Sequence, residues 1–113
     1  MNYDRIRDAI IAFNKERDWF QFYTPKEIAV AMSVEASELL EEFLWMSSED
    51  SVDHAKTTQN VQEEFADVFN YMVLFAEITW IDIEQAVMSK LEKNAKKYPV
   101  EKAKWVSTKY DEL

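Results

Sequence analysis

The chain has 113 residues, of which 48% are hydrophobic and 14% aromatic, so it is long and apolar enough to build the core of one domain. It contains no glycine and no cysteine, which excludes glycine-rich phosphate-binding loops, dinucleotide fingerprints, disulfides and thiolate metal sites. A net charge of −9 argues against a broad electrostatic grip on DNA or RNA, and a charged N-terminus without a long apolar stretch predicts a cytoplasmic protein outside the membrane.

The N-terminal half predicts two helices separated by an aromatic loop. Apolar residues at helical spacing indicate a first helix over about residues 3–17, and the aromatic segment 18–24 follows as a loop. Thr24, a proline and then Glu27 form a capping-box start for the second helix. We expect this second helix to continue to about Trp45.

The C-terminal half predicts two more helices and a tail. The polar segment 47–54 is typical of a connection, and a third helix is expected from about Ala55 or Thr57 to Thr79. A fourth covers about 82–97 and stops before a proline, which disfavours helical geometry in the preceding residue. Residues 1–113 are thus predicted to form a single domain with a tail from about residue 100.

The expected fold class is all-α, with a four-helix bundle as its core. The second and third helices are the longest and most apolar, so we expect them at the centre of the bundle. So small a bundle with so many aromatic residues is expected to bury surface against copies of itself, as a homo-oligomer.

Two acidic pairs fall on the apolar faces of the two central helices. At 100° per residue, Glu35 lies inside the apolar stripe of the second helix, and Glu38 lies within about 60° of it. Glu64 and Asp67 repeat this arrangement on the third helix. Carboxylates gathered in a bundle interior repel one another unless lysines, arginines or a divalent cation neutralise them. All-oxygen ligands at a spacing of three residues suit Mg²⁺ or Mn²⁺.

A single acidic pair of this kind is more often solvated or salt-bridged, so the duplication of the pair is what favours a metal site. A di-iron bundle is the natural rival, but it needs Glu-x-x-His pairs on two helices. The only histidine, His54, lies in the predicted connection and does not supply them.

These segments resemble a known family. The metal-binding signature of the MazG-like all-α NTP pyrophosphatases is similar to Glu35-Ala-Ser-Glu38-Leu-Leu-Glu41-Glu42 followed by Glu64-Phe-Ala-Asp67-Val and Tyr71. The chain also resembles the dCTP pyrophosphatase branch of that family in four places: Arg17-Asp-Trp19, Tyr23-Thr-Pro25, Trp45 and the segment 90–99. The resemblance covers roughly residues 5–104. The chain departs from the family at three positions where family members often have glycine: here they are Val34, Ser37 and Trp105.

The resemblance implies a Mg²⁺-dependent hydrolase that converts a nucleoside triphosphate to the monophosphate and pyrophosphate. It also implies dimers or tetramers, a house-cleaning role toward non-canonical or surplus dNTPs and, from the branch, a dCTP-like preference. On this basis the metal ligands are assigned to Glu35, Glu38, Glu64 and Asp67.

One carboxylate beside the metal must accept the proton of the attacking water. Glu38 is the first candidate, and Glu41 and Glu42 are the alternatives. Glu41 matches an acidic position of the family pattern, whereas Glu42 faces inward better on the helical wheel.

Phosphate and base contacts are predicted from the remaining motifs. Lys90, Asn94 and Lys97 share one face of the fourth helix and are candidates for phosphate binding, although lysines also favour a solvated helix C-terminus. Trp19 and Trp45 are candidates to stack on the nucleobase, with Tyr23 and Tyr71 beside them. The alternative function is a non-catalytic acidic helical module that binds a protein partner, in keeping with the small size and the negative charge.

Overall fold

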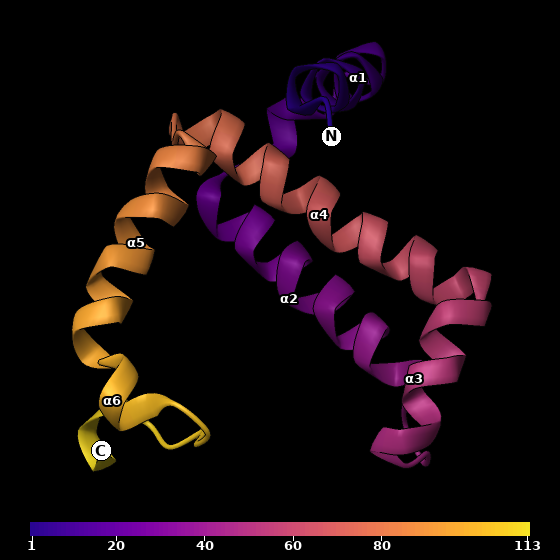
Figure 1. Ribbon diagram of the computed structural model, residues 1–113. Helices are drawn as coiled ribbons and strands as arrows, with labels where there is room; N and C mark the ends of the chain where they lie inside the picture. Colours follow the sequence, from indigo (N-terminus) through magenta and orange to yellow (C-terminus); the bar gives the residue numbers. More distant parts are fainter. The chain divides into compact units, whose positions relative to one another are not determined.

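The computed structural model describes all 113 residues, and every regular element in it is helical (Figure 1). The predicted all-α class is therefore confirmed. The six α-helices are α1 (Tyr3–Glu16), α2 (Pro25–Glu41), α3 (Ser48–Thr57), α4 (Gln59–Thr79), α5 (Ile83–Lys97) and α6 (Val100–Ala103). Short 3₁₀ turns cover Phe20–Phe22 and Tyr110–Glu112. None of these helices combines the length and the apolar character that crossing a membrane requires.

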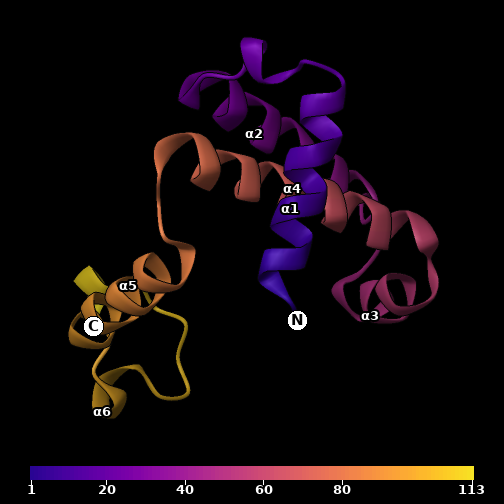
Figure 2. The same ribbon diagram turned by 90° about the horizontal axis from the view of Figure 1, so that it is seen from above.

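The chain divides into two units, Met1–Trp80 and Ile81–Leu113. In the first unit α2 and α4 lie side by side along much of their length, and α1 crosses α4 (Figures 1 and 2). The expected central position of the two longest helices is thus confirmed. Their contact buries a small apolar core, whose members are Ile28, Val61, Val73, Leu74 and Ala76.

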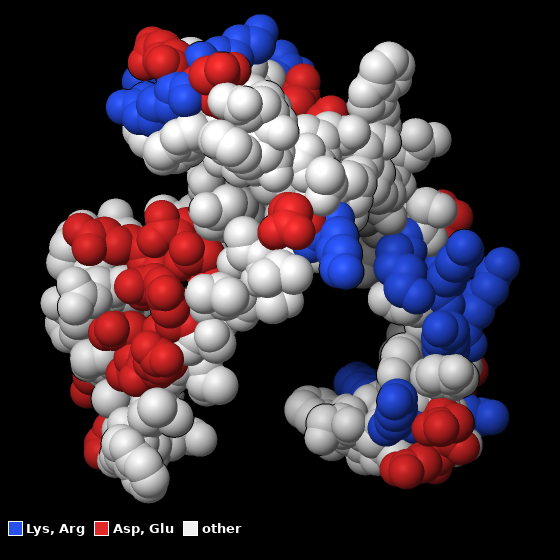
Figure 3. All heavy atoms as spheres, turned by 180° about the vertical axis from the view of Figure 1, so that it is seen from behind, with Lys and Arg blue, Asp and Glu red and all other residues white.

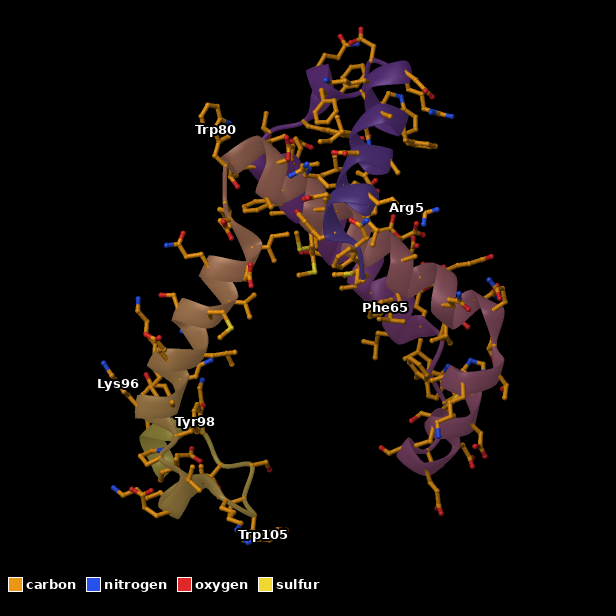
Figure 4. All side chains as sticks on the ribbon, turned by 45° about the horizontal axis from the view of Figure 1, so that its top comes forward. Arg5, Phe65, Trp80, Lys96, Tyr98 and Trp105 are labelled. Carbon is orange, nitrogen blue, oxygen red and sulfur yellow. The ribbon has the colours of Figure 1, made fainter.

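Large apolar side chains remain exposed on both central helices. Val34 is 49% exposed and Leu40 61% exposed on α2, and Phe65 is 64% exposed on α4. Figure 4 labels Phe65 on α4 and shows Trp80 projecting from the C-terminal end of that helix. Apolar surface of this extent is typical of a face that another surface covers.

The predicted helix starts are confirmed by their caps. Thr24 Oγ1 accepts a hydrogen bond from the backbone N–H of Glu27 at 3.1 Å. Asp82 Oδ1 accepts one from Gln85 N–H at 2.9 Å, which starts α5 one residue later. Each cap satisfies a backbone donor that the first helical turn leaves free.

The expected end of the second helix at Trp45 is wrong, because α2 ends at Glu41. Beyond Glu41 the backbone hydrogen bonds join residues three apart instead of four, as in a 3₁₀ turn. Phe43 N–H, for example, donates to Leu40 C=O at 2.9 Å. Trp45 then takes a left-handed backbone conformation, with φ 65°, which stops the helix.

The predicted connection over residues 47–54 is also wrong, because α3 occupies most of it. Ser47 Oγ caps this helix by accepting from Asp50 N–H at 3.0 Å, and acidic residues in the first turn favour the helix dipole. The extended backbone of Thr58, with φ −106° and ψ 119°, separates α3 from α4. The third predicted helix therefore begins at Gln59 and not at Ala55 or Thr57.

The second unit consists of α5 and a tail folded against its C-terminal end. The ring of Tyr110 meets that of Tyr98 edge to face, with 6.0 Å between the centroids. Lys97 Nζ lies 4.7 Å from the centroid of the Tyr110 ring, in a cation–π contact. The tail after residue 100 is thus partly ordered, through α6 and these ring contacts.

Candidate metal centre

Three carboxylates from the two central helices converge in the first unit. Glu35 on α2 and both Glu64 and Asp67 on α4 each offer one oxygen, and these oxygens all lie within 4.8 Å of one another. Glu35 and Glu64 are half-buried, and Asp67 is exposed. The convergence follows from the wheel positions, because α2 and α4 turn the stripes that contain these residues toward each other.

The convergence raises the proton affinity of the cluster. Burial is the main reason that the pKa of Glu35 rises to about 7, followed by a hydrogen bond with Glu38 and by the negative charges of Glu38, Asp67 and Glu64. The pKa of Glu64 is raised too, first by desolvation and then by a hydrogen bond and repulsion from Glu38. Without a counter-charge, the cluster favours its protonated form.

Two oxygens of this cluster have no hydrogen-bond partner. Glu35 Oε2 and Glu64 Oε2 are buried and unpaired, which is costly for polar atoms unless something else binds them. No lysine or arginine forms a salt bridge with either carboxylate; the ion pairs of the chain lie elsewhere. An all-oxygen set with unpaired atoms fits a hard divalent cation such as Mg²⁺ or Mn²⁺.

The other three acidic candidates differ in their surroundings. Glu38 lies outside the group of three, but it is close enough to Glu35 and Glu64 to raise the pKa of both. Glu41 is exposed, whereas Glu42 is half-buried and faces His54, with 3.5 Å between Glu42 Oε1 and His54 Nε2.

Tyr71 lies beside the carboxylates, whose charges act on its hydroxyl. Its pKa is raised by burial first and then by the negative charges of Glu35, Asp67 and Glu38. Tyr23 is half-buried, and its hydroxyl donates to Asn14 Oδ1 at 2.7 Å. Tyr71 also contributes to the raised pKa of Tyr23, after burial.

The two tryptophans predicted to bind a base differ in their contacts. The ring of Trp19 meets that of Phe13 edge to face, with 5.8 Å between the centroids, and Trp19 is 42% exposed. Trp45 follows α2 with its side chain fully exposed. Both side chains are therefore accessible to a ligand.

A groove that the sequence did not predict lies between α1 and α4, with a volume of about 820 Å³. Ile6, Ile10 and Phe13 line it from α1, and Phe65 and Phe69 line it from α4. Asp67 lines the same groove, so apolar walls adjoin one carboxylate of the cluster. The apolar stripe of the first helix was its only signal in the sequence, and such a stripe is normally assigned to the core.

The three candidates for phosphate binding lie in the second unit, where Figure 3 shows lysines gathered along α5. Lys90 and Asn94 line the same hollow, of about 340 Å³, on that helix. Lys97 faces Tyr110 through the cation–π contact described above. Their approach to the carboxylates stays a prediction from the sequence.

The fold is all-helical, and its two paired central helices bring three carboxylates together. This class of architecture is suited to binding a divalent cation. The chain belongs to the MazG-like family, whose model matches residues 30–113. This match confirms the resemblance drawn from the acidic motifs, and it covers all helices from the middle of α2 onward.

Individual relatives support the same assignment. The chain is 37% identical to dCTP pyrophosphatase 1 of Mus musculus and 35% identical to that of Homo sapiens, over 111 residues in each case. Both matches cover 96% of this chain but only 65% of the mammalian protein. The crystal structure of a pyrophosphatase from Archaeoglobus fulgidus superposes with a TM-score of 0.82 at 36% identity, covering 88% of this chain and 94% of the other.

Proposed function

We propose that this chain is a Mg²⁺-dependent nucleoside triphosphate pyrophosphohydrolase that converts (d)NTPs to (d)NMPs and pyrophosphate. The convergence of Glu35, Glu64 and Asp67, with two buried oxygens unpaired, is the observation that carries the proposal. Membership of the MazG-like family and the names of its pyrophosphatase relatives support it. A house-cleaning role toward non-canonical or surplus dNTPs, with a dCTP-like preference, is part of the same proposal.

The acidic residues are assigned different roles according to their positions. Glu35, Glu64 and Asp67 would hold the cation, with Glu38 beside them as the fourth proposed ligand. When bound, Mg²⁺ polarises the phosphate and lowers the pKa of a water. Glu38 is the first candidate to accept the water's proton, with Glu41 and Glu42 as alternatives. The water oxygen bonds to the α-phosphorus, the bond from that phosphorus to the bridging oxygen breaks, and pyrophosphate leaves.

The nucleobase of the substrate needs an apolar surface, and its phosphates need positively charged groups. The groove between α1 and α4 adjoins Asp67, and Phe13 in its wall contacts Trp19. This continuity supports the assignment of Trp19 to the nucleobase, and Trp45, Tyr23 and Tyr71 are the other proposed base contacts. Lys90, Asn94 and Lys97 are the proposed phosphate contacts, since ammonium and amide groups both donate to phosphate oxygens.

The exposed apolar faces of α2 and α4 support a homodimer or homotetramer as the working form. A cytoplasmic location, where nucleotides are abundant, is part of the same proposal. The whole chain, residues 1–113, is proposed to act as one catalytic domain.

A turnover screen tests this function. The protein is incubated with canonical and modified dNTPs in Mg²⁺, and pyrophosphate release is measured with and without EDTA. We expect release from at least one dNTP, its loss in EDTA, and its loss in Glu38→Gln and Asp67→Asn. The proposal fails if no triphosphate yields pyrophosphate above background or if both variants keep full activity.

A thermal melting experiment distinguishes this function from the alternative, a non-catalytic acidic module. A cation and nucleotide that bind only the folded state raise its melting temperature. A module without a nucleotide site predicts no such rise with Mg²⁺ and dNTP together.

A further inference from the structure

The one histidine of the chain joins three helices at one end of the α2–α4 pair. His54 lies in α3, and its ring meets that of Phe43, just beyond α2, edge to face with 5.8 Å between the centroids. Its Nδ1 lies 3.2 Å from Oγ1 of Thr58, the residue that precedes α4. Its Nε2 lies 3.5 Å from Glu42 Oε1. Both helices that carry the metal-binding carboxylates are thus tied to this ring.

The surroundings of each ring nitrogen fit one tautomer. With the proton on Nε2, Nδ1 accepts from the Thr58 hydroxyl, and the protonated nitrogen is the one that lies 3.5 Å from the Glu42 carboxylate. Nε2 is buried and makes no hydrogen bond, and the Glu42 carboxylate at 3.5 Å is the charge that it faces. The side chains of His54 and Glu42 are only 29% and 22% exposed, which reduces screening of the pair by salt.

Glu42 in turn acts on the metal centre. Glu42 follows Glu38 by four residues and Glu35 by seven, and its backbone is still helical, so it lies on the same face of α2, one and two turns further along. Its negative charge also contributes to the raised pKa of Glu64, after desolvation and the effects of Glu38 and Asp67. The same proximity that penalises ionised Glu64 in the absence of a cation attracts a cation to it. Cation affinity at oxygen sites increases with the number of nearby negative charges.

We infer that His54 is a positioning residue that holds the Glu42 carboxylate near Glu64, where its charge strengthens divalent-cation binding. The inference rests on the proposed metal centre, and it gives Glu42 an electrostatic role outside the group of three ligands. Sequence reasoning used His54 only to exclude a di-iron site, because it placed the residue in a connection. The unexpected helix α3 is what brings the ring to the end of α2.

Isothermal titration of Mg²⁺ into the ion-free protein tests this role without any turnover. Glu42→Gln removes the charge and keeps the shape. His54→Phe keeps a ring against Phe43 but loses both nitrogens, whereas His54→Gln retains an N–H donor that reaches toward Glu42. Asp53→Asn, on the exposed side of α3, is the control for loss of a surface charge.

We expect Glu42→Gln and His54→Phe each to weaken Mg²⁺ binding by about 3- to 10-fold, the effect of one partly screened charge several ångströms from a divalent ion. His54→Gln should recover most of the affinity, and the double variant should be no weaker than Glu42→Gln alone. Asp53→Asn should bind as the wild type does. Circular dichroism of each variant in EDTA checks that the helices are intact.

The outcomes separate this inference from the proposed function. If wild-type protein binds Mg²⁺ and Glu42→Gln binds it equally well, the inference is overturned and the metal centre stands. Additive losses in the double variant, or unchanged binding in His54→Phe, also overturn it, since His54 then does not act through Glu42. If the wild type gives no Mg²⁺ binding at all, the metal centre itself fails.

Discussion

The hydroxyl of Tyr23 donates a 2.7 Å hydrogen bond to Oδ1 of Asn14, the one polar side chain that is fully buried, at 2% exposure. Asn14 Nδ2 donates to the Ile10 carbonyl at 2.8 Å, and the Asn14 carbonyl accepts from Trp19 N–H at 3.1 Å. Asn14, near the end of α1, therefore anchors the segment that leads through Trp19 to α2, through both its side chain and its backbone carbonyl.

The first prediction concerns this link. Asn14→Ala leaves the Tyr23 hydroxyl without its partner, so we expect a loss of about 1–3 kcal/mol in the free energy of unfolding, measured by urea denaturation. Tyr23→Phe should cost about 1 kcal/mol or more, because Asn14 Oδ1 is then buried and unpaired. The double variant should lose less than the sum of the two; strict additivity would contradict the link.

The second prediction follows from the raised pKa of Glu35. An ordinary carboxyl titrates near 4.5, whereas Glu35 in the ion-free fold titrates near 7. Between these values the folded state binds more protons than the unfolded state, so stability falls as the pH rises through this window. Glu35→Gln removes that contribution, and its melting temperature in EDTA should gain on the wild type from about pH 4.5 to 7. A difference that does not change with pH would contradict the shift.

The third prediction concerns a helix end. Trp80 follows α4 with φ 62° and is 92% exposed, and left-handed backbone geometry is unfavourable for a residue with a Cβ. Trp80→Gly should be more stable than Trp80→Ala by roughly 0.5–1 kcal/mol after the entropy cost of glycine is deducted. Thermal unfolding of the two variants measures this, and a more stable alanine variant would contradict it.

The fourth prediction identifies the phosphorus that water attacks. When the reaction runs in ¹⁸O-labelled water, the oxygen that bonds to the α-phosphorus stays in the nucleoside monophosphate. Mass spectrometry should therefore find one label in the monophosphate and none in the pyrophosphate. Labelled pyrophosphate, or a diphosphate product with inorganic phosphate, would show attack at another phosphorus.

The helices that the sequence predicted well are those whose signals are local. Thr24 is a side-chain cap, and it was recognisable from the proline and Glu27 that follow it. The approach of Glu35 to Glu64 also followed from local periodicity, because each interrupts an apolar stripe and such stripes pack together. The helical period of 3.6 residues was therefore sufficient to predict that these carboxylates lie close together.

The features that were missed depend on backbone geometry or on long-range packing. The chain has no glycine, yet four other residues have positive φ: Asp18, Trp45, Trp80 and Trp105. Trp105 takes this geometry with φ 73°, at a position where the family resemblance led us to expect glycine. Ser47 signalled α3, but the polarity of the following residues masked its cap.

The groove at Asp67 was missed for a different reason. Ile10 and Phe13 belong to the apolar stripe of the first helix, and such stripes usually pack into a core. Here α1 crosses α4 and leaves these side chains along an open groove. A crossing of this kind depends on tertiary contacts that one sequence does not reveal.

The most direct test of the account compares two adjacent glutamates on α4. Glu64 contributes a buried, unpaired oxygen to the cluster, whereas Glu63 is exposed, so Glu64→Gln and Glu63→Gln make the same chemical change at neighbouring positions. Loss of residues that merely support metal ligands costs about 10- to 100-fold, so loss of a ligand should cost at least about 100-fold. Pyrophosphate release from the preferred dNTP in Mg²⁺ should fall by that factor in Glu64→Gln and stay within about twofold of the wild type in Glu63→Gln. Equal activity of the two variants would contradict a metal centre at Glu35, Glu64 and Asp67.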